Sequence, residues 1–300
     1  MANTEAVRDS VDAWTVEALG PLTPDSLPML DALVVHSGWN QTAQDWGVFA
    51  SFGSIYAVRD AEGRIVASGA VLPMGKRRSG YLAGLTGRGV AWISMILVAP
   101  ALRGQGLGRR VFDHCLRHVQ DEDRIAMLDA TPQGEALYRQ FGFEPLWRLT
   151  RWRRGASPAT QTAPADKPAL EALAVMDTDA LGFDRTALLG ELLGRPDSFC
   201  VRSAQGFAVV RSGRVAHHIG PLLATDEESA AALLRRAVAC LPGPVLIDVP
   251  DDRPLVRRAL TEAGFEPQRG FARMSLERSG HRGNQGQTHL IHAIAGPEFA

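Results

Sequence analysis

The chain has 300 residues, of which 45% are hydrophobic and 22% charged, and its formal net charge is −1. This length fits two folded domains of modest size, and the balanced charge gives no indication of a nucleic-acid or membrane surface. Its three cysteines, Cys115, Cys200 and Cys240, show no metal-ligand or disulfide spacing. We therefore expect reduced core cysteines, no metal site and a cytoplasmic protein.

The beginning of the chain supports the same compartment, because it contains acidic residues and no long apolar run, so neither a signal peptide nor a membrane span is expected. Two helices and a hairpin follow. A Thr-Pro-Asp sequence opens the first helix, and a turn over residues 60–63 joins the hairpin strands. The elements predicted here are helices over residues 23–36 and 42–52 and strands over 54–59 and 65–73.

The segment over residues 91–119 organises the first half of the chain. An apolar run, residues 92–98, is typical of a buried strand, and residues 107–119 have the apolar spacing of an amphipathic helix. Between them stand Arg103 and three glycines, at positions 104, 106 and 108. A helix N-terminus carries unpaired N–H groups and partial positive charge, and glycines let a phosphate approach the backbone. The segment predicts an anion site.

Three phosphate-binding motifs can be compared with this loop. A P-loop requires Lys after its second glycine, and none follows here. The dinucleotide fingerprint requires a third glycine where Arg109 stands. A third pattern, Arg/Gln-x-x-Gly-x-Gly/Ala, is satisfied by Arg103, Gly106 and Gly108. A tight turn that binds no ligand remains the alternative.

After the glycine loop, the first half continues with a strand over residues 124–130 and a helix that Thr131 can cap and Gly142 can end. A strand over residues 143–151 follows, and then an Ala/Pro/Thr-rich linker. The second half repeats this pattern weakly, and Gly264-Phe265-Glu266-Pro267 echoes Gly142-Phe143-Glu144-Pro145. Its predicted strands are 199–202, 207–211, 214–219 and 245–249, and its predicted helices are 226–241 and 253–263.

The loop motif and a second segment, Ala136 to Phe143, together resemble the GNAT superfamily of acyl-CoA-dependent N-acyltransferases. The resemblance implies an α/β fold with tandem GNAT-like domains, each a central mixed β-sheet flanked by helices. The expected organisation is an N-terminal acetyltransferase domain over 1–152, a linker over 153–168, a degenerate C-terminal GNAT-like domain over 169–277, and a disordered tail over 278–300. The second copy lacks the loop chemistry, because acidic residues 226–228 stand at its helix N-terminus and Leu260 replaces Tyr138.

The resemblance also implies a site for acetyl-CoA as co-substrate. The loop amides would hold the pyrophosphate, and the end of the strand over 92–98 would pair with the pantetheine arm. The cofactor-binding residues expected from it are Ile96, Leu97, Val98, Arg103, Gly104, Gln105, Gly106, Leu107, Gly108 and Arg109. A helix–helix corner would border the acceptor, with Trp39, Asn40, Asp45, Trp46 and Trp92 as expected substrate-binding residues. Core packing is the alternative role of the tryptophans.

Acyl transfer from a thioester also requires a proton for the leaving thiolate, and Tyr138 is the general acid that the resemblance implies. A core tyrosine with a satisfied hydroxyl is the alternative. The base that deprotonates the amine is not assigned, and Asp45, Asp129 and Glu144 are candidates. The family often has Asn where Pro132 stands, which removes one contact to the pantetheine arm.

These features predict an N-acetyltransferase that transfers an acetyl group from acetyl-CoA to a primary amine of a small molecule by direct attack. Two alternatives remain open: a non-catalytic acyl-CoA-binding or sensing module, and an acetyltransferase for protein N-termini or lysines. No nucleic-acid or membrane partner is expected, and either a monomer or a homodimer fits the sequence.

Overall fold

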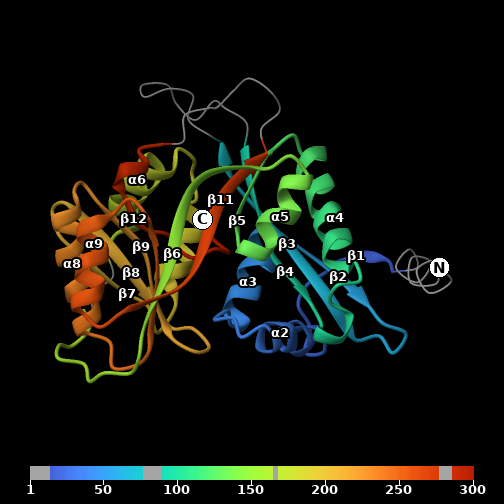
Figure 1. The fold of residues 1–300 in the computed structure, drawn as a ribbon, viewed down its shortest axis with the longest axis horizontal. Helices are drawn as coiled ribbons and strands as arrows, with labels where there is room; N and C mark the ends of the chain where they lie inside the picture. Colours follow the sequence, from blue (N-terminus) through green and yellow to red (C-terminus); the bar gives the residue numbers. More distant parts are fainter. Residues whose placement is uncertain (1–13, 77–88, 165–167, 277–285) are drawn as a thin grey trace. The chain divides into compact units, whose positions relative to one another are not determined.

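The computed structural model describes residues 14–76, 89–164, 168–276 and 286–300. Its contacts divide the chain into two compact units. Unit 1 comprises residues 1–73 and 91–126, and unit 2 comprises residues 74–90 and 127–300. Both units contain β-sheet flanked by helices, which confirms the predicted α/β class (Figure 1).

Unit 1 contains the predicted helices, hairpin and central strand, together with a short first strand. The strand order is β1-β2-β3-β4, and β2 pairs antiparallel with both β1 and β3. The elements are β1 (Val16–Leu19), α2 (Ser26–His36), α3 (Ala43–Phe52), β2 (Ser54–Arg59), β3 (Ile65–Lys76), β4 (Gly89–Val98), η1 (Pro100–Leu102) and α4 (Leu107–Asp121).

Helix α4 packs on this sheet through the apolar side that the sequence predicts. Val111, Phe112 and Cys115 are each 0% exposed. A Cβ atom on Gly69 of β3 would lie 2.7 Å from Val111 Cγ1 and 2.9 Å from Cys115 Sγ. Glycine at this position therefore lets the helix approach the sheet closely, and the helix axis that starts at the glycine loop is fixed by core packing.

Unit 2 contains the rest of the first predicted repeat and all of the second. Its elements in the first repeat are β5 (Ile125–Ala130), α5 (Pro132–Gln140) and β6 (Glu144–Arg154). The second repeat begins with α6 (Leu170–Leu181), α7 (Thr186–Gly194), β7 (Phe199–Arg202), β8 (Gly206–Arg211) and β9 (His217–Ala224). It ends with α8 (Glu227–Ala239), β10 (Val245–Pro250), α9 (Pro254–Glu262), β11 (Glu266–Leu276), η2 (Thr288–Leu290) and β12 (Ile291–Ala293).

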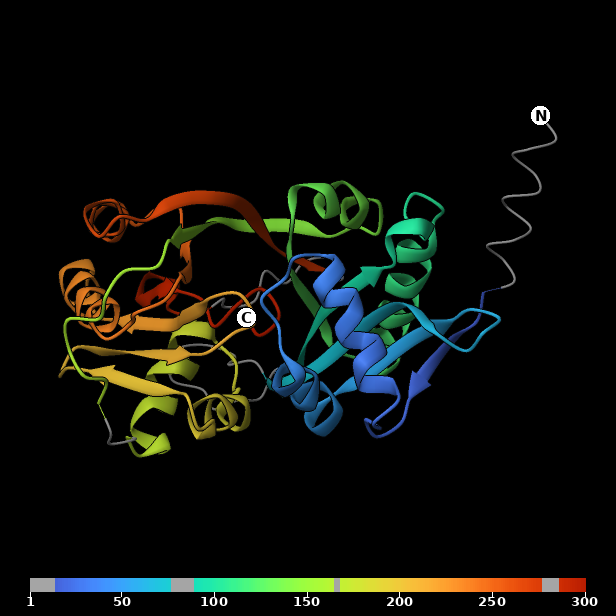
Figure 2. The same cartoon turned by 90° about the horizontal axis from the view of Figure 1, so that it is seen from below.

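Helices cover both faces of the β7–β9 part of the unit 2 sheet. Helix α8 lies on one face and α6 and α7 on the other (Figure 2). The core on the α8 side includes Leu234, Ile247 and Leu260, which are each 0% exposed. Leu260 thus fills a core position in the second repeat, which explains a leucine there without any catalytic role.

The two repeats exchange the strands that follow their last α-helices, β6 after α5 and β11 after α9. The strand order in unit 2 is β5-β11-β6-β10-β9-β8-β7, and β12 pairs with β9. Strand β11, from the second repeat, lies between β5 and β6 of the first, while β6 lies between β11 and β10 (Figures 1 and 2). The antiparallel β6/β11 ladder places Trp147 opposite Arg273. Because of this exchange, the contact-defined units divide the chain differently from the expected domains.

Several sequence expectations need correction. The tail over residues 278–300 is not disordered where it is described, because residues 286–300 include η2 and β12, and Ile291, Phe299 and Ala300 are buried. The rest of that tail lies outside the described residues. Of the α-helices and β-strands in the described residues, the sequence patterns also missed β1, α6, α7, β11 and β12, and they did not indicate the short 3₁₀ helices η1 and η2.

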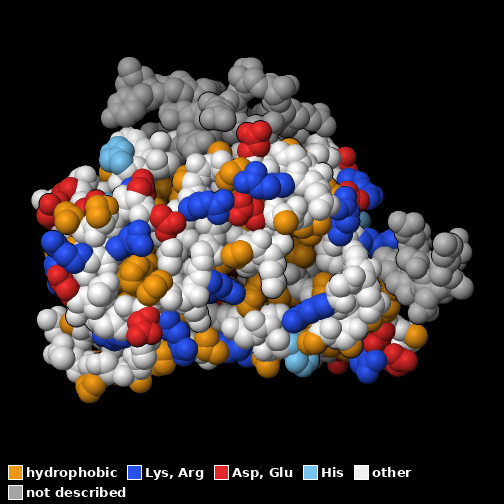
Figure 3. Space-filling view, in the orientation of Figure 1, with side chains coloured by type: hydrophobic (Ala, Val, Ile, Leu, Met, Phe, Trp, Pro, Cys, Tyr) orange, Lys and Arg blue, Asp and Glu red, His pale blue; other side chains and the backbone are white. Residues whose placement is uncertain are grey.

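The distribution of charged side chains on one face agrees with the composition. On the face drawn in Figure 3, acidic and basic side chains are interspersed, as the net charge of −1 suggests. Among the helices of the described residues, none combines the length and the apolar character that crossing a bilayer requires. The described residues also hold no group of three or more His, Cys, Asp or Glu side chains placed to bind a metal ion.

Candidate functional site

The predicted anion loop is a sharp turn in unit 1 between β4 and α4. Gly104 and Gly106 have φ values of +78° and +84°, in the left-handed region that favours glycine. Gly106 is the N-cap of α4, and the first turn of that helix contains no acidic residue. The first N–H groups of a helix have no intrahelical acceptor. The start of α4 therefore combines exposed backbone donors with the positive end of the helix dipole.

The Arg103 side chain hydrogen-bonds to two other segments of unit 1. Its Nε donates to the carbonyl oxygen of Val98 at 3.0 Å, and a terminal nitrogen donates to Ser37 Oγ at 3.2 Å. Ser37 is the C-cap of α2. Arg103 therefore ties the end of β4 to the end of α2, and an added role in phosphate binding stays a prediction.

Strand β4 is irregular just before the residues predicted to bind the pantetheine arm. Met95 has a φ of +55°, which is rare for a residue other than glycine. Its carbonyl oxygen accepts a hydrogen bond from the buried Ser68 hydroxyl at 3.0 Å. This local distortion reorients the strand immediately ahead of Ile96–Val98.

The helix at the corresponding point of the second repeat has the opposite electrostatics. Asp226 caps α8 by accepting from the Ser229 N–H at 2.7 Å, and these contacts lower the pKa of Asp226. Glu227 and Glu228 stand in the first turn. Glu227 also accepts from the Leu255 N–H at 2.7 Å. The N-terminus of α8 is thus already occupied by carboxylates, as the sequence suggested, whereas that of α4 is not.

The residues predicted to touch the acceptor lie mainly in the core of unit 1. Trp46 and Trp92 are 0% exposed, so packing alone accounts for both side chains. Asp45 caps α3, accepting from the Thr42 N–H at 2.7 Å. Asn40 is also buried, and Trp39 is partly exposed. Their part in substrate binding stays a prediction, and none of the four buried side chains is carried into the site proposed below.

Tyr138 lies on α5, in unit 2. This helix has no fully buried residue, and Thr131 caps it by accepting from the Gly134 N–H at 3.2 Å. A Cβ atom on Gly134 would lie 2.9 Å from Tyr138 Cε2, so the tyrosine ring rests against the glycine one turn earlier. The side chain is half-buried. Glycine at position 134 therefore sets the direction of the Tyr138 phenol.

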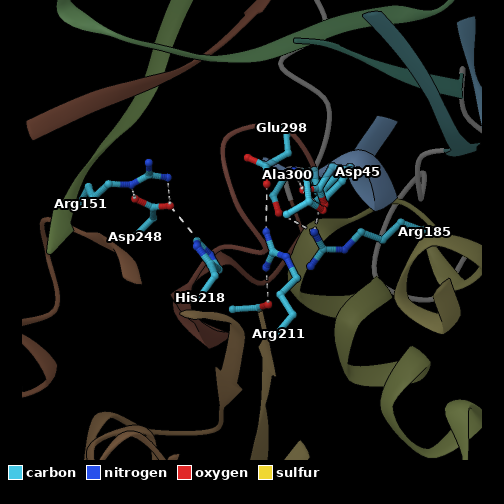
Figure 4. A network of polar contacts seen from close by, with 11 residues as sticks. Asp45, Arg151, Arg185, Arg211, His218, Asp248, Glu298 and Ala300 are labelled. Atoms are coloured by element: carbon cyan, nitrogen blue, oxygen red, sulfur yellow. Dashed lines mark hydrogen bonds and ion pairs between the residues drawn. The ribbon is translucent and has the colours of Figure 1, made fainter. Parts of the chain in front are cut away.

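The exchanged strands form two equivalent acid–arginine pairs in unit 2. Arg273 of β11 binds Asp129 of β5 through two hydrogen bonds of 2.9 and 2.8 Å. Arg151 of β6 binds Asp248 of β10 through two hydrogen bonds of 2.8 Å (Figure 4). All four side chains are at most 5% exposed. In each pair the acid and the arginine come from different repeats.

The pairs differ in what lies beside them. His218 Nε2 lies 3.9 Å from Asp248 Oδ2, and Arg211 binds Glu298 at 2.9 Å nearby (Figure 4). Burial and the surrounding arginines lower the pKa of His218 well below its ordinary value. Burial raises the pKa of Asp129, against the opposing effect of Arg273. An ion-paired and enclosed Asp129 is poorly placed to act as the base for the amine.

The Asp129–Arg273 pair borders a pocket within unit 2. The Arg273 guanidinium carbon lies 4.4 Å from the centroid of the Trp147 ring. The pocket has an empty volume of about 320 Å³, counting space open to solvent. It is lined by Met127, Leu146, Trp147, Leu181, Phe183, Arg273, Thr288 and Ile291.

Sequence reasoning missed Arg273 and Trp147 as site residues. Trp147 lies in a strand that was predicted, but Arg273 lies in β11, which was not. The only available signal was the similarity between Leu128-Asp129 and Ile247-Asp248, because it marks the two acids of the equivalent pairs. Strand exchange then decides which arginine each acid meets.

Comparisons with known proteins agree with this architecture. Residues 26–143 match the Acetyltransferase (GNAT) family, and residues 173–289 match the Acetyltransferase (GNAT) domain. The chain is 26% identical over 184 residues to the uncharacterized N-acetyltransferase YitH of Bacillus subtilis (strain 168), a match that covers 58% of this chain and only 65% of that protein. It is 29% identical over 225 residues to Holothin acyltransferase of Pseudoalteromonas sp. (strain SANK 73390), covering 70% of this chain and 73% of that protein.

Among solved structures, the fold is similar to a tandem GNAT protein from the clavulanic acid biosynthesis pathway. The TM-score is 0.61 at 17% identity, and the match covers 89% of this chain and 99% of that chain. At this identity the likeness concerns the fold alone. The chain belongs to the GNAT acetyltransferase family and carries two GNAT domains in tandem.

Proposed function

We propose that this protein transfers an acetyl group from acetyl-CoA to the primary amine of a small molecule. One observation carries the proposal. The N-terminus of α4 follows two left-handed glycines and has no acid in its first turn, whereas carboxylates occupy the equivalent end of α8. Within an acetyltransferase family, this contrast supports a co-substrate site in the first repeat alone.

The loop fits the pyrophosphate of acetyl-CoA in charge and in shape. Its exposed backbone at Gly104–Gly106 carries no side chain beyond Gln105, and Arg109 adds an exposed positive charge one turn into α4. In the proposal, the amides of residues 103–109 bind the pyrophosphate. Ile96, Leu97 and Val98 pair with the pantetheine arm, in the stretch of β4 that follows the distortion at Met95.

The reaction is a direct displacement. The neutral amine attacks the thioester carbonyl carbon, so a C–N bond forms and the C–S bond breaks. Tyr138 donates its phenolic proton to the departing thiolate, and solvent or an unassigned base takes the proton lost by the amine. An ordinary alkyl ammonium has a pKa of about 10, so the site must favour the neutral form. General acid assistance of this kind contributes about 10²–10⁴-fold.

The named relatives support the reaction type. Both carry acyl transfer in their names, one as an N-acetyltransferase and one as an acyltransferase for holothin. We carry over only that reaction type.

Calorimetry with acetyl-CoA, followed by an amine screen, tests the proposal. We expect one binding site, lost when Arg103 and Gly106 are replaced together. We also expect release of free thiol when a suitable amine is added at saturating acetyl-CoA. Binding without thiol release from any amine or protein acceptor would favour a sensing module. Two equivalent binding sites would contradict the assignment to the first repeat.

A further inference from the structure

We propose that the pocket lined by Trp147 and Arg273 binds a neutral, apolar ring or chain attached to the acceptor amine. This inference rests on the acetyltransferase function proposed above and names the class of its substrate. It places recognition of the acceptor on strand β11, which the second repeat contributes to the first. The second repeat then selects the substrate while the first repeat binds the co-substrate.

The walls of the pocket favour an apolar group. Six of its lining side chains are apolar or aromatic: Met127, Leu146, Trp147, Leu181, Phe183 and Ile291. Leu146 and Trp147 are partly exposed, so apolar surface is left for a ligand to cover. Ligand pockets usually combine such walls with a few polar groups. Here Thr288 and the ion-paired Arg273 are the polar residues of the lining.

The charge state of the pocket argues against a charged ligand. Arg273 is the charged residue in its lining, and its guanidinium is neutralised by the two hydrogen bonds to Asp129. A second ammonium or a carboxylate on the ligand would lose water there without gaining an unpaired counter-ion. The Arg273 guanidinium carbon lies over the Trp147 ring, 4.4 Å from its centroid, so this cation already has an aromatic partner as well as a carboxylate.

The equivalent pair in the second repeat shows that such a pair accommodates a planar ring. There the imidazole of His218 lies beside Asp248, and the same protein therefore places one of its own rings next to the Arg151–Asp248 pair (Figure 4). In the first repeat, the residue pairing is the same but the pocket is open. A ligand ring in that pocket would complete the similarity between the two repeats.

The pocket is built on the strands that also hold the helix of Tyr138. Met127 and Asp129 share one face of β5, since side chains alternate along a strand. Helix α5 leads directly into β6, and a Cβ atom on Gly142 at its end would lie 3.3 Å from Leu276 of β11. Strand β11 thus contributes Arg273 to the pocket and also packs against the end of α5. A change in the pocket is therefore connected to the helix that carries Tyr138.

Three primary amines test the inference in the full-length protein: phenethylamine, 1,4-diaminobutane and β-alanine. Thiol release gives kcat and KM for each, and calorimetry without acetyl-CoA gives phenethylamine binding directly. 1,4-Diaminobutane and β-alanine each carry a second ionised group, which phenethylamine lacks. We expect kcat/KM for phenethylamine to exceed that of both by about tenfold or more, the range that apolar pockets provide. Thr288→Phe, which fills the pocket, should raise the phenethylamine KM about tenfold and change kcat less than about twofold.

Val175→Phe is the matched control, because it adds the same ring at an exposed position of α6, where Val175 is 63% exposed. It should leave both constants unchanged. Equal use of all three amines, or an unchanged KM in Thr288→Phe, would overturn the inference. Phenethylamine binding that Thr288→Phe abolishes, without thiol release, would support the pocket as a binding site and contradict the proposed acetyltransferase function. Absence of phenethylamine binding in the unaltered protein would contradict the pocket as a binding site.

Discussion

Asp129 and Arg273 form a bidentate ion pair although 144 positions separate them in the chain. Their equivalents, Asp248 and Arg151, pair in the same way across 97 positions. Each acid belongs to the strand that follows the glycine-loop position of one repeat, and each arginine belongs to the strand that follows the last α-helix of the other. The exchange of β6 and β11 is therefore fixed by reciprocal charge pairs as well as by the sheet ladder.

Removal of one buried arginine should destabilise the protein strongly. Arg151→Met leaves Asp248 enclosed with 0% of its side chain exposed and without its bidentate partner. We expect a loss of about 3–5 kcal/mol in the free energy of unfolding, measured by urea denaturation. Arg148→Met is the control, because Arg148 pairs with Glu135 while 55% exposed, and such pairs contribute about 0–1 kcal/mol. Equal losses in both variants would contradict a special role for the buried pair.

Charge reversal at the start of α4 should separate stability from co-substrate binding. Arg109→Glu places an acid in the first turn, as α8 has naturally, and should stabilise the helix by about 0.3–1 kcal/mol. The same carboxylate should repel the pyrophosphate and weaken acetyl-CoA binding by about tenfold or more, measured by calorimetry. Arg117→Glu, at the other end of α4, should leave that affinity within about twofold. A normal affinity in Arg109→Glu would argue against the loop as the pyrophosphate site.

The proposed acid role of Tyr138 predicts how two substitutions change kcat. Tyr138→Phe should lower kcat by about 10²–10⁴-fold with little change in acetyl-CoA affinity. Gly134→Ala should lower kcat as well, because the added methyl group would lie 2.9 Å from Tyr138 Cε2 and displace the ring. Tyr56→Phe is the control, since the Tyr56 ring meets the His114 ring edge-to-face in unit 1 at a centroid distance of 4.6 Å. Turnover unchanged in Tyr138→Phe would remove the acid role.

The buried His292 predicts that the free energy of unfolding falls in weak acid. Burial, with Arg253 as a second cause, lowers the pKa of His292 to about 4. Between that value and about 6.5 the unfolded chain binds a proton that the folded protein does not, so stability is lost as pH falls through this window. The loss from His292 should reach about 3 kcal/mol, and His292→Gln should remove it from the pH dependence of urea unfolding. His36→Gln, at an exposed position of α2, should keep the full dependence.

Local sequence patterns determined several secondary-structure elements and the duplication of this protein. The strand, glycine loop and helix over residues 91–119 were predictable because apolar periodicity and left-handed glycines act over a few residues, and β4, the turn and α4 follow them. The duplication was also visible, since Leu128-Asp129 and Ile247-Asp248 occupy matching strands β5 and β10. The acidic start of α8 was equally readable, because capping and helix-dipole effects are local.

Tertiary structure decided the rest. The tail was expected to be disordered from its polar composition, yet residues 291–293 pair with β9, because the apolar residues Leu290, Ile291 and Ile294 are buried against the sheet. Two of the tryptophans expected at the acceptor site, Trp46 and Trp92, are enclosed, since an apolar side chain fits a core and a pocket equally well in sequence. The choice of Arg273 as the partner of Asp129 depends on which strand enters the sheet between β5 and β6. Nothing local to either residue specifies that choice, because hydrogen-bond ladders between strands form at any sequence separation.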